Sequence, residues 1–272
     1  MNHKKQCKLC DAETFYKFSL FLVAGLRGDY FECQTCRMLQ SHHLDELTPQ
    51  GLIQLANYDP GIDLDAGAAW RQHCLVSRLG QLVRLKILPK ADPNFKMLDY
   101  GCGTGFLVSY LAHRFRWNTF GYEPYMTPSY AQHKIFADWA SCGRGYNLVI
   151  ASEVFEHFIN PREELLRIRE ILAPDDAFIY VTTGLYVPGQ TTQSWPYLAP
   201  QSGHHVSFYA HQTMQKVKQL IGASAVYQVG ADYEWLFTFG ESYRSWSKVA
   251  QLAIATRLLR RSTRLGILPK IE

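Results

Sequence analysis

The segment "LDYGCGTG" carries glycines at alternate positions, Gly101, Gly103 and Gly105, and the carboxylate of Asp99 stands two residues before the first of them. A triphosphate-binding loop needs Gly-Lys-Ser/Thr, but here Phe106 follows the last glycine, which excludes a nucleoside triphosphate. A dinucleotide-binding loop needs G-x-G-x-x-G, whereas this spacing is G-x-G-x-G. The acid would repel a pyrophosphate and would attract an ammonium group. The turn therefore favours a ligand that is cationic near Asp99, and a tight strand–helix connection without a ligand is the alternative.

A second carboxylate, Glu123, stands 24 residues after Asp99 at the end of the next predicted strand. In doubly wound sheets a carboxylate at this position lies near ribose hydroxyls. S-adenosylmethionine (SAM) meets each condition, because it has an amino acid end, a sulfonium and a ribose with both hydroxyls free. We therefore expect SAM as the cofactor.

Two cysteine pairs, Cys7 with Cys10 and Cys33 with Cys36, have the C-x-x-C spacing and are separated by 22 residues. Two such pairs can present four thiolates to one zinc ion in a closed, structural site. The metal would help to fold a segment too short to form its own core. Disulfides, unpaired core cysteines and a rubredoxin-like iron site with the same ligands are the alternatives.

Three histidines could take a proton from an acceptor, because the imidazole titrates near neutral pH. His157 follows a predicted strand in "YNLVIASEVFEHF". His204 and His205 stand after "QTTQSWPYLAPQSG", a stretch with the length and polarity of a substrate lid. The alternative is that His157 packs near a helix start and that the histidine pair lies in a solvated loop.

The patterns around these residues alternate between strands and helices, which predicts an α/β fold with a doubly wound, mostly parallel sheet. A helix is predicted from about Ala66 to Leu88, and another in "NPREELLRIREIL", with Asn160 as N-cap, Pro161 at its first position and Glu163 three residues after the cap. "SAVYQVG" and "YEWLFTFG" predict a final antiparallel pair. The further predicted elements are the strands "FKMLDY", "NTFGYEP", "YNLVIAS" and "AFIYVTT" and the helix "FLVSYLAHRF".

The charge distribution and the cysteine content limit the classes of binding partner and the compartment that we expect. Of 28 Lys and Arg residues, seven lie in 243–272, and the rest of the chain has 21 basic and 23 acidic residues. Nucleic acid is therefore not an expected partner. The tail predicts a basic amphipathic helix that either packs on the domain or contacts an anionic membrane surface. Cysteines grouped for a metal suit a reducing compartment, so we expect a cytoplasmic protein.

The motifs "LDYGCGTG", "GYEP" and "YNLVIASEVFEHF" resemble those of class I SAM-dependent methyltransferases, over about residues 66–240. The resemblance implies a seven-stranded Rossmann-like sheet, with Gly101 and Gly103 near the methionine part of SAM and Glu123 on its ribose. By the same resemblance Ala137, Asp138 and Trp139 would lie near the adenine, and Ser152 and Glu153 would line the floor. Tyr58, Trp70 and Arg71 would cover the cofactor.

A zinc ribbon (1–45), a linker (46–65), a SAM domain (66–242) and the basic helix (243–272) together resemble a bacterial arrangement that often serves glycan or deoxysugar pathways. His157 and His205 of this chain match functional histidines of the related sugar C-methyltransferases. His204 stands where those enzymes have a glutamate. We therefore expect methyl transfer to a small-molecule, sugar-nucleotide or glycan acceptor through oxygen, carbon or nitrogen. An RNA methyltransferase acting on rRNA bases and a non-catalytic SAM-fold scaffold are the alternatives.

Overall fold

A computed structural model of the chain describes residues 5–48, 51, 66–230 and 233–240. Tyr58, most of the predicted linker and the predicted C-terminal helix lie outside these residues. No helix in the described part is both long and apolar enough to cross a membrane. The elements are β1 Thr14–Phe21, η1 Val23–Gly25, β2 Arg27–Cys33, β3 Leu39–Ser41, α2 Ala66–Arg84, β4 Lys96–Tyr100, α3 Phe106–Phe115, β5 Asn118–Tyr122, η3 Gln132–Lys134, β6 Ile135–Phe136, η4 Trp139–Cys142, β7 Leu148–Ser152, η5 Phe155–His157, α4 Pro161–Ile171, β8 Phe178–Thr182, η6 Pro196–Leu198, β9 Ser207–Phe208, α5 His211–Leu220, β10 Ala225–Gln228 and β11 Glu234–Thr238.

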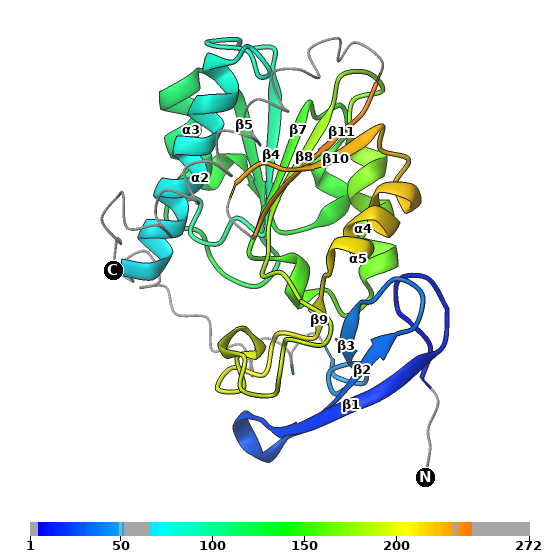
Figure 1. Cartoon of the computed structure of the whole chain (residues 1–272). Coiled ribbons are helices and arrows are strands. Elements are labelled where there is room, and N and C mark those ends of the chain that lie inside the picture. Colours follow the sequence, from blue (N-terminus) through cyan, green and yellow to red (C-terminus); the bar gives the residue numbers. More distant parts are fainter. Residues whose placement is uncertain (1–4, 49–50, 52–65, 231–232, 241–272) are drawn as a thin grey trace, which may run out of the picture.

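The larger sheet has, within the described residues, seven strands in the order β10-β11-β8-β7-β4-β5-β6 (Figure 1). β4 to β8 run parallel, and β11 is antiparallel to both of its neighbours. The chain reverses its direction of travel across the sheet after β6, so β4 and β7 are neighbours. This topology confirms the predicted doubly wound sheet with a final antiparallel pair.

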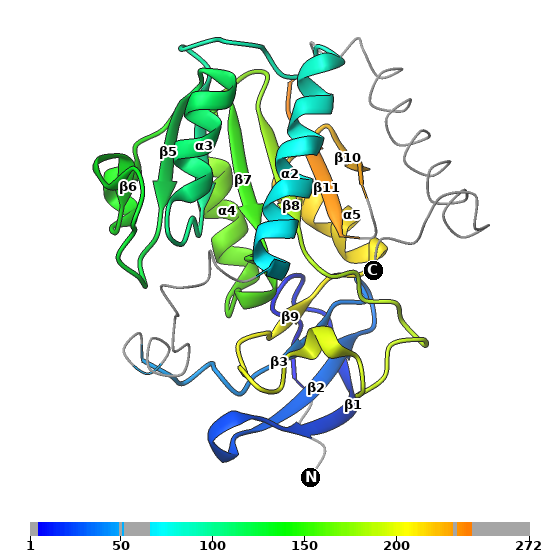
Figure 2. The ribbon, with the colours of Figure 1, turned by 90° about the vertical axis from the view of Figure 1, so that its left-hand side faces the viewer.

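Helices cover both faces of this sheet, with α2 and α3 on one side and α4 and α5 on the other (Figures 1 and 2). Successive strand residues alternate between the two cores, as in β4, where Met97 packs with α2 and α3 and Leu98 packs with α4 and α5. Parallel strands buried on both faces are apolar without interruption, which is why these runs could be recognised in the sequence.

One helix end and one helix cap differ from the prediction. α2 stops at Arg84 instead of Leu88, because Lys86 adopts a left-handed conformation with φ 58° and Ile87 N–H donates to the Leu82 carbonyl at 2.9 Å. This 6→1 bond is that of a Schellman motif. α4 begins at Pro161 as predicted, but the side chain of Asn160 makes no capping hydrogen bond.

The N-terminal segment forms a second sheet, which we call the ribbon sheet, in the order β1-β2-β3-β9 within the part of the chain that the structure describes. Its last strand, β9, comes from the long segment between β8 and α5, and Leu39 of β3 pairs with Phe208 of β9. The ribbon sheet lies beyond the carboxyl ends of β7 and β8 (Figures 1 and 2). The participation of β9 was not predicted.

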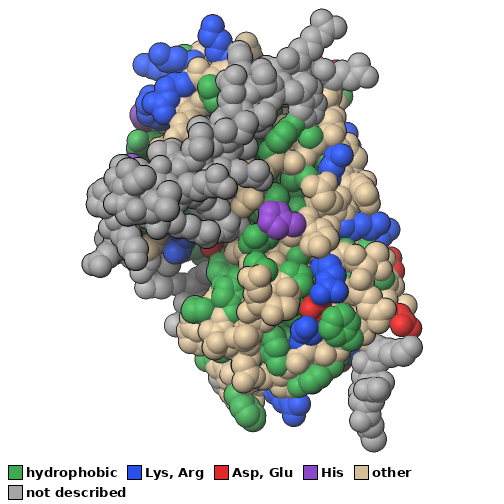
Figure 3. Space-filling model, viewed as in Figure 1, with side chains coloured by type: hydrophobic (Ala, Val, Ile, Leu, Met, Phe, Trp, Pro, Cys, Tyr) green, Lys and Arg blue, Asp and Glu red, His purple; other side chains and the backbone are tan. Residues whose placement is uncertain are grey.

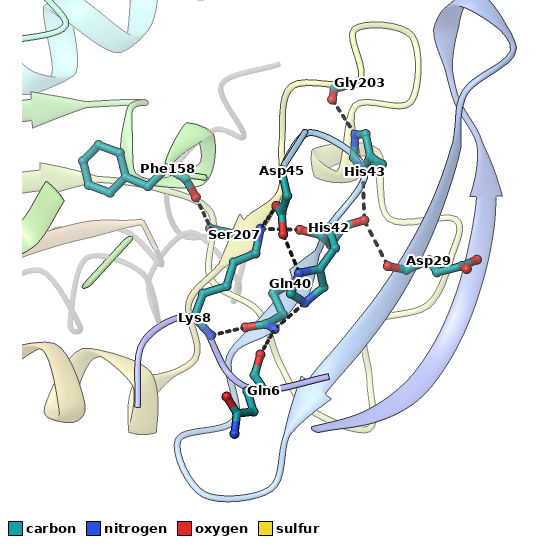
Figure 4. Close-up of polar contacts among 11 residues, drawn as sticks. Gln6, Lys8, Asp29, Gln40, His42, His43, Asp45, Phe158, Gly203 and Ser207 are labelled. Atoms are coloured by element: carbon teal, nitrogen blue, oxygen red, sulfur yellow. Dashed lines mark hydrogen bonds and ion pairs between the residues drawn. The ribbon is translucent and has the colours of Figure 1, made fainter. Parts of the chain in front are cut away.

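Polar contacts join the ribbon sheet to the rest of the fold (Figure 4). The His43 ring hydrogen-bonds through Nε2 to the Gly203 carbonyl at 2.8 Å, and Ser207 Oγ donates to the Phe158 carbonyl at 2.7 Å. Ser41 N–H also donates to the Val206 carbonyl at 2.8 Å. The ribbon sheet therefore directly supports residues 203–207, which include two of the predicted histidines.

The outer surface of the ribbon sheet carries apolar side chains among Lys and Arg (Figure 3). Phe21, at the end of β1, is 86% exposed, and Tyr16 is 55% exposed. On the inner side, Cys7, Leu9 and Met38 belong to the same apolar core as Tyr209 and Met214. One continuous core therefore spans the ribbon sheet and the α4/α5 face.

Candidate active site at the carboxyl edge of the sheet

The glycine turn between β4 and α3 needs glycine for conformational and steric reasons. Gly101, Gly103 and Gly105 have φ of 70°, 55° and 81°, a region that other residues enter at a cost. A Cβ on Gly105 would also lie 2.4 Å from the Tyr130 carbonyl oxygen. At the other end of the turn, Gly101 N–H donates to the Tyr122 carbonyl at 2.8 Å, which ties the turn to β5.

The turn has one open side and one closed side. A Cβ on Gly103 would meet only the sulfur of Met126, at 3.7 Å, so the backbone there borders free space. A Cβ on Gly101 would lie 2.8 Å from Cγ2 of Val154. The turn therefore abuts the "EVFEH" segment at Gly101 and leaves the backbone open at Gly103, where a side chain would occupy the free space.

Asp99 and Glu123 are buried beside the turn, with 4% and 6% of their surfaces exposed. The backbone of Asp99 is part of β4, but its side chain forms no hydrogen bond or ion pair with another described residue. Its burial, together with the charge of Glu123, raises the pKa of Asp99 to about 8. Glu123 accepts hydrogen bonds from the backbone N–H groups of Gly103 and Tyr125, both at 2.9 Å. Burial raises the pKa of Glu123 above its usual range. A cationic ligand group would complement this pair of acids.

The residues predicted near the adenine follow β6. Asp138 is exposed and stands at the N-cap of η4. The Trp139 ring packs against Tyr100 and Tyr122, with centroids 5.6 and 5.1 Å apart. Trp70, predicted to cover the cofactor, is half exposed at the start of α2, beside an exposed Arg71. The adenine and covering roles stay predictions.

The "EVFEH" segment begins with a strained residue at the carboxyl end of β7. Ser152 Oγ lies 3.0 Å from Thr182 Oγ1, and Glu153 has φ 55° although it is not a glycine. Such a conformation costs on the order of 1–3 kcal/mol and persists where the surroundings impose it. Here the Glu153 N–H donates to the Thr182 carbonyl at 2.9 Å, and Thr182 Oγ1 donates to Glu153 Oε1 at 2.9 Å.

Glu156 is fully buried and is held by two hydroxyl groups. Thr183 Oγ1 donates to its Oε2 at 2.9 Å, and the Tyr197 hydroxyl donates to its Oε1 at 2.6 Å. Burial and the neighbouring Glu153 raise the pKa of Glu156 to about 8. Tyr197 reaches this position only because residue 184 is glycine, since a Cβ there would lie 2.4 Å from the Tyr197 ring.

The three predicted histidines lie together next to Glu156. The ring centroid of His157 is 4.8 Å from that of His205 and 6.1 Å from that of His204. Burial, together with the two neighbouring histidines, lowers the pKa of His157 to about 3, so its ring is neutral at neutral pH. His205 Nδ1 lies 2.6 Å from the Tyr197 carbonyl oxygen, and burial lowers the pKa of His205.

The four cysteines of the two pairs also come together, as predicted. The Cys7 and Cys36 sulfurs are 3.6 Å apart, as are those of Cys10 and Cys33. All four sulfurs lie within 4.8 Å of one another. These distances exclude disulfides in this structure and approach the separation of about 3.8 Å between thiolates in a tetrahedron with zinc bonds of about 2.3 Å. The geometry of the cysteines therefore fits one closed metal site.

A family profile described as "Methyltransferase domain" matches residues 70–228, which is more than half of the chain. The chain belongs to this family. It is a SAM-dependent methyltransferase, and the glycine turn lies within the matched residues.

Several solved structures align with this methyltransferase, each with a TM-score under 0.5. A candidate O-methyltransferase from Nostoc punctiforme aligns with TM-score 0.47 and 12% identity, over 71% of this chain and 62% of that one. Cyclopropane synthase MmaA2 from Mycobacterium tuberculosis aligns with TM-score 0.43 and 14% identity, over 70% and 71% of the two chains. Magnesium protoporphyrin IX methyltransferase from Synechocystis, solved with bound S-adenosylhomocysteine (SAH), aligns with TM-score 0.45 and 15% identity, over 64% and 85%. No curated protein matches the chain in sequence. Likenesses this weak say nothing about the acceptor.

Sequence reasoning gave no role to several residues that form the polar part of this methyltransferase site. Glu156 was part of a recognised motif, but nothing in the sequence shows that Thr183 and Tyr197 enclose it. The glycine in "VTTGLY", Gly184, was a detectable signal, because an isolated glycine after a strand often marks a close approach by another group.

Proposed function

We propose that this methyltransferase transfers a methyl group from SAM to a small-molecule, sugar-nucleotide or glycan acceptor at the carboxyl edge of the sheet. The observation that carries the proposal is the buried Asp99, which has no described partner and lies at a glycine turn that abuts the "EVFEH" segment. A cationic cofactor bound at the turn would therefore lie next to the polar side chains of Glu156, His157 and His205, against which the acceptor would bind.

The residues around the turn fit SAM. Asp99 would pair with its ammonium group, and the open side of Gly103 would admit its amino acid part. Backbone donors already fix both carboxylate oxygens of Glu123, and each oxygen retains a lone pair for a ribose hydroxyl. SAM, when bound, supplies the methyl group, and the protein positions the two reactants.

The acceptor would lie against the histidines and Glu156. His205 is the better candidate base of the two closest histidines, because an Nδ1–H bond to the Tyr197 carbonyl would leave a lone pair on Nε2. His157 is a poor base near neutral pH, since its pKa lies at about 3. The resemblance to sugar C-methyltransferases at His157 and His205 supports a sugar-containing acceptor. His204 lies farther from His157 and takes the place of a glutamate in that resemblance.

The cysteine cluster is proposed to bind one structural zinc ion. Four sulfurs would complete its coordination and leave no position for a substrate. The expected result is one tightly bound zinc ion per chain from the cysteines, measured by plasma mass spectrometry. Replacing Cys33 by serine should remove it.

The experiment for the main proposal has two stages. Isothermal calorimetry with SAM and SAH should show binding that Glu123→Gln weakens by at least tenfold, because a buried hydrogen-bonding partner is lost. Transfer of labelled methyl groups is then measured with sugar nucleotides, glycans and rRNA. The absence of SAM binding to zinc-loaded protein would refute the proposal and favour a scaffold. Transfer to rRNA alone, with an affinity that falls steeply with salt, would identify an RNA methyltransferase instead.

Two further expectations concern partners and location. The segment 243–272 is proposed to contact anionic membranes or to pack on the domain, and binding of the full chain and of a chain ending at residue 242 to anionic vesicles distinguishes the two. A reducing, cytoplasmic environment is proposed from the cysteines, because the four sulfurs of the cluster are unpaired in the structure.

A further inference from the structure

A second group of potential metal ligands lies apart from the cysteine cluster. Glu156 and His157 come from η5, and His205 comes from the segment before β9. One ligand atom from each of the three residues lies within 4.8 Å of the other two. Two chain segments that are distant in sequence thus present two imidazoles and one carboxylate to a common point.

These side chains are held as metal ligands usually are. An imidazole that binds a metal through one nitrogen commonly donates the other N–H to a carbonyl or carboxylate. His205 Nδ1 lies 2.6 Å from the Tyr197 carbonyl oxygen, which leaves Nε2 free to coordinate. The carboxylate of Glu156 is oriented by the hydroxyls of Thr183 and Tyr197, and its oxygens keep lone pairs for a cation.

The cluster also lacks a positive partner among the residues that the structure describes. Nδ1 of His157 is buried and has no hydrogen-bond partner in the structure. Glu156 is 0% exposed and makes no ion pair with a described lysine or arginine. A second acid, Glu153, is nearby, because the Tyr197 hydroxyl lies 2.6 Å from Glu156 and 3.3 Å from Glu153. Buried acids and an unpaired ring nitrogen are costly unless a cation or donor satisfies them.

We propose that Glu156, His157 and His205 bind a divalent first-row transition-metal cation, such as zinc, iron or cobalt. Two histidines and one carboxylate are a ligand set that these metals use in sites that keep open coordination positions. Bonds of about 2.1 Å would place the ligand atoms about 3.0–3.4 Å apart, so atoms that now lie within 4.8 Å of one another would approach by at most about 1.4–1.8 Å on binding.

The proposed metal site adds a means of activating the acceptor, and this role rests on the proposed methyl transfer. An open coordination position would hold an oxygen of the acceptor and lower its pKa, with the released proton passing to solvent. His157 and His205 would then act as ligands, and the metal would take over the activation that a histidine base would otherwise provide. The binding of the metal itself can be tested without any acceptor.

The test counts metal ions on the full chain. The protein is stripped with a chelator, reloaded with excess Co²⁺ or Zn²⁺, desalted and measured by plasma mass spectrometry. We expect two ions per chain for the unmodified protein and one for Glu156→Gln and for His157→Gln. His204→Gln is the matched control, because His204 is not part of the ligand group, and it should retain two ions.

Cobalt spectra separate the two sites. Cobalt bound to the cysteines gives intense thiolate charge-transfer bands, whereas a site with nitrogen and oxygen ligands adds only weak visible bands. We expect Glu156→Gln to lose the weak bands and keep the intense ones, and Cys33→Ser to lose the intense ones. SAM calorimetry and thermal unfolding are run on each variant, and His205→Gln serves as a further test if one variant does not fold.

A count of one ion in the unmodified chain, falling to zero in Cys33→Ser, would overturn the inference. So would a count of two that persists in Glu156→Gln, His157→Gln and His205→Gln. A chain that holds two ions but does not bind SAM would leave the metal site standing and would refute the proposed function. The metal site and the proposed function can therefore be refuted independently of each other.

Discussion

The protonation state of Asp99 leads to a quantitative expectation about how cofactor binding depends on pH. In the free protein, burial and the charge of Glu123 raise the pKa of Asp99 from its ordinary value of 3.8 to about 8. At neutral pH the carboxyl group is therefore largely protonated. A ligand whose ammonium group pairs with Asp99 favours the ionised form, so binding below pH 8 must release a proton.

The sign and size of the pH effect follow from this linkage. The affinity should rise with pH while Asp99 is protonated in the free protein, and it should level off near its pKa. A single group with a pKa of about 8 gives a rise of about tenfold between pH 6 and pH 7, with about one proton released per ligand bound.

Calorimetry with SAH tests this expectation, because SAH keeps the amino acid end and does not transfer a methyl group. Titrations in two buffers with different ionisation heats count the released protons. Asp99→Asn should remove both the pH slope and the proton release. Asp175→Asn, an exposed acid in the turn before β8, is the matched control and should keep both. An affinity that changes less than about twofold from pH 6 to pH 7, or a slope that survives in Asp99→Asn, would refute the reasoning.

Other substitutions test the close contacts in the structure. Gly105→Ala should lower the free energy of unfolding by about 1–3 kcal/mol in urea titrations, because its Cβ would lie 2.4 Å from the Tyr130 carbonyl oxygen; an unchanged midpoint would contradict this. Gly184→Ala should cost a similar amount by displacing the Tyr197 ring. Gly80→Ala, the same change in α2, meets open space and should stabilise the protein by about 0.5–1 kcal/mol. A loss of stability in Gly80→Ala as well as in the two loop variants would indicate a nonspecific effect. Cys33→Ser should reduce the zinc content by one ion per chain and lower the unfolding midpoint, and zinc retained in full would argue against the cysteine site.

Much of the central sheet could be predicted from the sequence. The runs that became β7 and β8 are apolar at nearly every position, because both faces of a parallel sheet are covered. The glycine turn was recognisable because its conformation and its contact with Tyr130 both require glycine at position 105. Local chemistry determined these features, so local sequence revealed them.

The remaining features depend on contacts between distant segments. β9 has two residues, and it is a strand only because β3 lies beside it. The burial of Glu156 depends on Thr183 and Tyr197, which arrive from the segment after β8. The early end of α2 depends on a lysine in a left-handed conformation, which glycine or asparagine would have signalled more clearly.

The shared sheet limits how this protein can be divided or rebuilt. Since Ser207 and Phe208 form the last strand of the N-terminal sheet, an enzyme expressed from residue 66 onward would leave β9 without its partner strand β3 and lose the support of Gly203 by His43. A different metal-binding module in place of the N-terminal segment would need an edge strand that pairs with β9 in the same register. Without it, residues 203–207 would lose their support. The N-terminal segment and the methyltransferase domain are therefore joined structurally through a two-residue strand.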